Sequence, residues 1–195
     1  MIYHEASIWG MGKYVWYVGY GSNLCRERFH CYIQGGQFPW GGSKASGCND
    51  KSLPLEDRPF RVPHGLYFAF PSSSWGGGVA FLDPKRSGTD FSHGRMWKIT
   101  AEQYGEVREQ EGRLLYDHEI YLGEEDGIPI LTVTSGEVLN PCEKPSEGYL
   151  RTIALGLNDT LGMSVDDVVE YLWGKEGIKG NYTRDGLKDI LDSVF

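Results

Sequence analysis

Two carboxylates stand at the end of a predicted helix, in the sequence Glu109-Gln110-Glu111-Gly112, where a carboxylate could move protons in acid/base chemistry. Residues two apart lie on roughly opposite faces of a helix, so Glu109 and Glu111 cannot both point at one site. We expect one of them to be solvated and the other to turn inward. The helix dipole disfavours a glutamate at this end, so Glu111 needs a reason to be there. Glu111 could therefore be an ordinary solvated residue at a helix end, or it could be a catalytic group.

A glycine turn near the start of the chain is the second place where chemistry could occur. Residues 14–20 are rich in aromatic and β-branched side chains, as buried strands are, and lead into a turn at Gly19 and Gly21. Ser22 and Asn23 stand where side chains cap a following helix. Such a corner presents backbone N–H groups that bind anions and carbonyl oxygens. The residues of this turn are consistent both with a purely structural role and with a binding site for a small ligand.

Three familiar glycine motifs do not fit this turn. The dinucleotide-binding motif needs a glycine where Leu24 stands, and a phosphate loop needs a Lys-Ser or Lys-Thr ending that the segment lacks. A nucleophile elbow around Ser22 needs glycines where Tyr20 and Leu24 stand. The five histidines have no metal-binding spacing, so we expect no metal and no cofactor.

Cysteines in the first predicted helix are a further chemical candidate. Cys25 and Cys31 lie near Arg26 and Arg28, and neighbouring cations can lower the pKa of a thiol. The sequence places no histidine and asparagine pair beside them. A hydrolase or amidotransferase that reacts covalently through Ser22 or Cys25 stays a third possibility.

The elements that would position these residues form an α+β order, with strands first and helices last. A capping box at Thr100 to Gln103 begins the helix that ends near Glu111. Residues 1–13 are expected to be a loosely docked arm, and 35–63 an irregular insertion. Strands are predicted at 14–20, 66–70, 79–82, 93–99, 118–122 and 129–135, and helices at 22–33, 100–110, from 145, and as C-terminal helices within 164–195.

The length and charge of the chain limit what it can be. Its 195 residues are most simply one domain, 1–195, that can bury a full core. With 27 acidic against 19 basic residues the net charge is −8, which argues against nucleic acid or an anionic membrane as the main partner. No signal peptide and no membrane-spanning run is evident, and the cysteines show no paired motif, so a cytoplasmic protein is expected. The sequence carries no signal for a particular oligomeric state.

Three segments in order resemble the gamma-glutamylcyclotransferase-like superfamily. They are the turn Tyr20-Gly21-Ser22-Asn23-Leu24, the helix end Glu109 to Gly112, and the proline-started stretch Lys144 to Ile153, which contains Tyr149. Each motif is short, but their order and their separation of about ninety residues are specific. The resemblance covers roughly 14–24, 66–135 and 144–162, whereas 35–63 departs from it.

The resemblance implies a mixed fold, a small β-barrel with surrounding helices, and a metal-independent enzyme that acts on a small-molecule γ-glutamyl substrate. It implies that Glu111 is the general acid/base. The α-amine would attack the γ-carbonyl and release 5-oxoproline and an amine. A non-catalytic small-ligand binding or regulatory module of the same fold is the alternative. The substrate-binding residues implied are Tyr20, Gly21, Ser22, Asn23, Leu24 and Tyr149.

Overall fold

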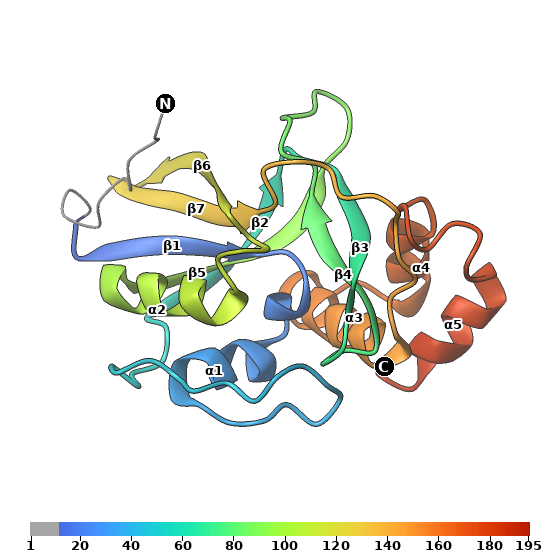
Figure 1. The fold of residues 1–195 in the computed structure, drawn as a ribbon, viewed down its shortest axis with the longest axis horizontal. Helices are drawn as coiled ribbons and strands as arrows, with labels where there is room; N and C mark the ends of the chain where they lie inside the picture. The colour runs from blue at the N-terminus through green and yellow to red at the C-terminus, as the bar shows by residue number, and fades with distance from the viewer. Residues whose placement is uncertain (1–11) are drawn as a thin grey trace.

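The computed structural model describes residues 12–195 and has the mixed α+β architecture expected from the sequence (Figure 1). One sheet of five strands has the order β2-β5-β1-β7-β6, and β3 and β4 form a separate hairpin. The strands are β1 (Tyr14–Gly19), β2 (Glu56–Val62), β3 (Leu66–Ser72), β4 (Gly77–Leu82), β5 (Ser92–Thr100), β6 (His118–Glu125) and β7 (Ile128–Thr134). The helices are the 3-10 turn η2 (Ser22–Leu24), α1 (Arg26–Gln34), α2 (Ala101–Glu111), α3 (Glu147–Leu161), α4 (Val165–Trp173) and α5 (Arg184–Asp192).

Strand β1 is the centre of the larger sheet and is buried on both faces. It pairs antiparallel with β5 and parallel with β7. Because side chains alternate along a strand, Val15 and Tyr17 enter the core beneath α1 and α2, whereas Trp16 and Val18 enter the other core. Tyr17 therefore points toward the helix that ends at Glu111.

The second core joins the β3–β4 hairpin to the three C-terminal helices, which lie together at one end of the molecule (Figure 1). Helix α3 packs directly on the η2 turn. A Cβ atom added at Gly156 would come within 2.5 Å of the Leu24 carbonyl carbon, so only glycine permits this approach. The packing of α3 against Leu24 thus fixes the position of the η2 turn.

The segment after the first strand differs from the predicted helix over 22–33. A 3-10 turn comes first, with Leu24 N–H donating to the Gly21 carbonyl and Cys25 N–H to the Ser22 carbonyl. Cys25 is then extended, and α1 begins at Arg26 without a side-chain cap. Ser22 and Asn23 lie inside the tight turn, so their expected capping role is wrong.

The predicted irregular insertion over 35–63 is also only partly irregular. Its end forms β2, which pairs antiparallel with β5. Pro59 lies within this strand and is tolerated because β2 is an edge strand, where one row of N–H groups needs no partner. Residues 35–55 remain a long connection without a regular helix or strand.

The strands, the capping box at Thr100 and the three C-terminal helices are confirmed. The closed barrel stays a prediction, since the described strands form two sheets. The predicted arm lies, up to residue 11, outside the described residues. No helix within residues 12–195 is long and apolar enough to cross a membrane.

Candidate active site

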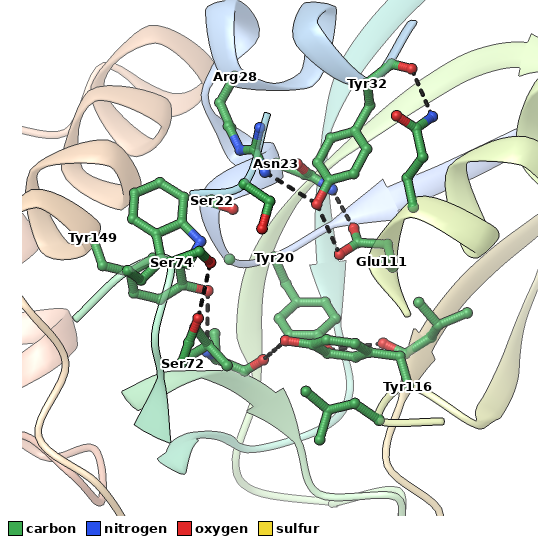
Figure 2. Close-up of a pocket in the computed structure, with 18 of the residues that line it drawn as sticks. Tyr20, Ser22, Asn23, Arg28, Tyr32, Ser72, Ser74, Glu111, Tyr116 and Tyr149 are labelled. Atoms are coloured by element: carbon green, nitrogen blue, oxygen red, sulfur yellow. Dashed lines mark hydrogen bonds between the residues drawn. The ribbon is translucent and has the colours of Figure 1, made fainter. Parts of the chain in front are cut away.

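A cavity of about 140 Å³ opens where the η2 turn, the first turns of α1 and α3, the β3–β4 hairpin and the end of α2 meet (Figure 2). Segments far apart in the sequence form its wall, and the wall is mainly aromatic and polar. Its lining residues include Tyr17, Tyr20, Gly21, Ser22, Asn23, Arg28, Tyr32, Ser43, Ser72, Ser74, Trp75, Ala80, Glu111, Tyr116 and Tyr149.

The Glu111 carboxylate faces the glycine turn across this cavity. Oε1 accepts hydrogen bonds from the Tyr17 hydroxyl at 2.8 Å and from the Asn23 side-chain amide, and Oε2 accepts from the Tyr32 hydroxyl at 3.4 Å (Figure 2). Burial raises the pKa of Glu111, although these donors and the charge of Arg28 oppose the shift. A carboxylate with a raised pKa is suited to take up and return a proton.

The neighbouring carboxylate behaves as the helix geometry predicts. Glu109 has a 60% exposed side chain and pairs with Arg113 at 2.6 Å. The prediction that the two glutamates diverge is therefore confirmed, and a solvated helix end is wrong for Glu111. The capping box at Thr100 fixes where α2 begins, and Gly112 ends it with a positive φ of 89°.

The glycine turn is held rigidly against the opposite wall. A Cβ atom at Gly21 would lie 2.7 Å from the Tyr149 hydroxyl. The Asn23 carbonyl accepts a hydrogen bond from the indole N–H of Trp97 at 3.0 Å, and Asn23 as a residue is only 4% exposed. Asn23 Oδ1 is buried and has no hydrogen-bond partner among residues 12–195. The turn therefore offers an unused acceptor beside Glu111.

Two tyrosines complete the wall through bonds to the backbone. The Tyr149 hydroxyl accepts from the Ala80 N–H at 3.0 Å, and its ring meets that of Trp75 edge-on at 4.8 Å. Burial raises the pKa of Tyr149 to about 12, so this hydroxyl stays protonated at neutral pH. The Tyr20 hydroxyl donates to the Val133 carbonyl at 2.8 Å.

Most of the predicted site residues converge on the one cavity. Leu24 is the exception, because its side chain is fully buried in the core with α3 and does not line the cavity. Cys25 is also buried outside it, and burial raises the pKa of its thiol to about 12. The possibility that the nearby arginines lower the pKa of this thiol is therefore contradicted. Those that do line the cavity are Tyr20, Gly21, Ser22, Asn23, Glu111 and Tyr149.

Among the lining residues that were not predicted from the sequence are Tyr17, Arg28, Tyr32 and Trp75. Two signals could have found three of them. Arg28 and Tyr32 are four residues apart and so share one face of α1. Alternation along β1 separates Tyr17 from its neighbours and places it on the side of α2. Nothing local distinguishes Trp75 from an ordinary loop residue.

The connection over 35–55 contributes to the wall near Trp75. The Gly42 N–H donates to the Ser74 carbonyl at 3.0 Å, and Ser43 lines the cavity. Gly42 has a φ of 81°, and a Cβ there would lie 2.9 Å from the Trp75 ring. This segment therefore contributes Ser43 to the lining of the cavity and packs against Trp75.

Comparisons with known proteins agree with the fold. No protein-family model matches the sequence. A solved gamma-glutamyl cyclotransferase is 19% identical, with a TM-score of 0.58 over 93% of this chain and 99% of that one. An uncharacterized protein from Homo sapiens is 20% identical, with the same TM-score and the same coverage of both chains.

A curated relative is similar in sequence over part of its length. Histone deacetylase 5 of Arabidopsis thaliana is 33% identical over 200 residues, which cover 81% of this chain. The match spans only 30% of the deacetylase. The solved neighbours, together with the order of the three motifs, show that this chain has the fold of the gamma-glutamylcyclotransferase-like superfamily.

Proposed function

We propose that this protein is a γ-glutamyl cyclotransferase that converts a γ-glutamyl amine or peptide into 5-oxoproline and a free amine. The observation that carries the proposal is the partly buried Glu111 carboxylate, which lines the cavity together with the Gly21–Asn23 turn. The fold it shares with a gamma-glutamyl cyclotransferase supports the proposal without fixing the activity.

The reaction needs little more than this arrangement. The α-nitrogen of the glutamyl group reaches its own γ-carbonyl through a five-membered ring, so attack is intramolecular and little entropy is lost at the transition state. A C–N bond forms in the ring as the C–N bond to the leaving amine breaks. Glu111 would take a proton from the α-ammonium and return it to the departing nitrogen.

The cavity supplies acceptors where the ammonium would lie. Glu111 is one. Asn23 Oδ1, which has no partner among residues 12–195, is the second, and the hydrogen bond that the Asn23 amide N–H donates to Oε1 holds it beside Glu111. Backbone N–H groups of the Gly21–Asn23 turn would stabilise the oxyanion on the γ-carbonyl. Tyr149 and Tyr20 would support the turn and the aromatic wall against which the substrate packs.

The test is a product assay with a matched pair of variants. The protein is incubated with a panel of γ-glutamyl amines and dipeptides, and 5-oxoproline is measured. Glu111→Gln is expected to lose about 10²- to 10⁴-fold in kcat, the range for a lost acid/base group, while Glu109→Gln on the exposed face keeps wild-type activity. Full activity of Glu111→Gln on the best substrate would show that the mechanism is wrong.

Two further outcomes separate the alternatives. Saturable binding of γ-glutamyl compounds without product across the panel would favour the non-catalytic module. A covalent adduct at Ser22 or Cys25, detected by mass spectrometry after mixing with substrate, would favour the covalent route. The burial of Cys25 argues against the second outcome.

A further inference from the structure

Arg28 is a buried cation in the wall of the cavity. Its side chain comes from the first turn of α1 and is only 2% exposed. Nη2 donates to the Tyr32 hydroxyl at 3.2 Å, whereas Nε and Nη1 have no hydrogen-bond partner among the residues described. The guanidinium lies 4.5 Å from the centre of the Tyr32 ring and 5.6 Å from that of Trp75. Two of its three nitrogens are therefore buried without a hydrogen-bond partner in this part of the chain.

Burial of an arginine in this state is costly unless an anion joins it. A charge removed from water needs an oppositely charged partner and hydrogen bonds to offset the free energy of desolvation. Contacts with aromatic faces offset only part of this free energy. Arg95 shows the contrast, because it is equally buried but pairs with Asp57 and Asp159. A planar guanidinium fork matches a carboxylate in particular. The chemistry of Arg28 therefore indicates a carboxylate ligand.

The position of Arg28 relative to Glu111 indicates which carboxylate this is. The Tyr32 hydroxyl accepts from Arg28 and donates to Glu111, so a single oxygen bridges the cation and the anion (Figure 2). Opposite charges at so short a separation suit a ligand whose ammonium and carboxylate leave the same carbon. In a γ-glutamyl compound this carbon is the α-carbon.

We propose that Arg28 binds the α-carboxylate of the glutamyl group while the α-nitrogen faces Glu111, an inference that rests on the proposed function. Arg28 would thus set the orientation in which the α-nitrogen can attack the γ-carbonyl. It is a binding and specificity residue with no part in proton transfer. A carboxylate on the leaving amine is the other source that the same chemistry could recognise.

Three substrates distinguish the two carboxylates. γ-Glutamyl-alanine carries both, γ-glutamyl-ethylamide lacks the one on the leaving group, and 4-aminobutanoyl-alanine lacks the α-carboxylate but can still cyclise. We expect Arg28→Met to lose about 10- to 100-fold in kcat/KM, mainly through KM, on both γ-glutamyl substrates, as a lost charge-assisted hydrogen bond would. On 4-aminobutanoyl-alanine the loss should be less than about threefold, because no α-carboxylate is there to lose.

Two variants control for structural effects. Arg28→Lys keeps the charge without the fork, so it should recover part of the loss if the role is ligand binding. Arg26 lies on the same helix, but its side chain is 41% exposed and pairs with surface carboxylates. The kcat/KM values of Arg26→Met should therefore match those of wild type on all three substrates. Loss on γ-glutamyl-alanine and 4-aminobutanoyl-alanine, with γ-glutamyl-ethylamide unaffected, would overturn the assignment and move Arg28 to the carboxylate of the leaving group. No loss, or equal loss on all three substrates, would make Arg28 structural and also overturn it.

A binding measurement keeps the inference separate from the proposed function. If the wild-type protein turns over none of the substrates, the proposed reaction fails, and calorimetry is used with L-glutamine and 4-aminobutanamide. These two ligands differ only in the α-carboxylate. A preference for L-glutamine that Arg28→Met abolishes would support carboxylate binding at Arg28. Equal affinity for the two ligands, or no binding of either, would overturn it.

Discussion

The hydroxyl of Tyr17 provides a sharp test of how the site controls its proton. Tyr17→Phe removes one oxygen and keeps the ring that stacks on Phe29 at 5.5 Å. Burial and the charge of Glu111 raise the pKa of Tyr17, so the hydroxyl is a donor to the Glu111 carboxylate. Because this donor favours the charged form of Glu111, its removal should raise the pKa of Glu111 further.

The size of the effect follows from the bond that is lost. A buried hydrogen bond to a charged group contributes about 1.5 to 3 kcal/mol, which corresponds to roughly one to two pH units. Asn23 and Tyr32 still donate to Glu111, so we expect a shift near the lower end, about one unit. A base must be deprotonated to act, so activity falls on the acid side of the profile. In Tyr17→Phe the midpoint of this limb should move to higher pH.

The assay is the pH dependence of kcat/KM for 5-oxoproline release, which reports the free enzyme. Tyr104→Phe is the matched control, because the Tyr104 hydroxyl donates at 2.7 Å to Glu119, a different carboxylate that does not line the cavity. Its profile should match wild type. If the acid limb of Tyr17→Phe stays in place or moves to lower pH, Glu111 is not the group that titrates.

Three further predictions concern stability. Burial raises the folded pKa of Glu111, so its contribution is complete below the unfolded value of about 4.3 and is lost as pH rises through the folded pKa. In urea unfolding, the free energy of unfolding of Glu111→Gln should rise relative to that of wild type between pH 4 and pH 7. A difference between the two proteins that does not change with pH would contradict this. Gly156→Ala should cost about 1–3 kcal/mol by pressing on Leu24, whereas Gly174→Ala, which has open space, should stay within about 0.5 kcal/mol. Thermal unfolding of Arg95→Met should show a loss of about 3 kcal/mol, the low end for a broken buried pair because its two aspartates reach solvent, and an unchanged Tm would refute this.

Much of the fold could be predicted because its signals are local. Alternation and aromatic content marked the strands, and the Thr100 capping box marked a helix start that the structure confirms. The 3-10 turn was missed because Ser22 and Asn23 have the same side chains that cap a helix. Strand β2 was missed because Pro59 is excluded from central strands, and only pairing reveals that β2 is at an edge.

The sequence by itself determined that Glu109 and Glu111 must diverge, and that a glycine turn follows the first strand, because helix period and glycine conformation are local properties. Only the tertiary structure decided that Glu111 is the inward one, since this depends on α2 packing beside β1 under α1. It also decided that Tyr17, Tyr32 and Arg28 surround that carboxylate. Arg28 and Glu111 are far apart along the chain. No local sequence pattern indicates that both side chains are removed from solvent in the same cavity, and the chemistry of their charges depends on this environment.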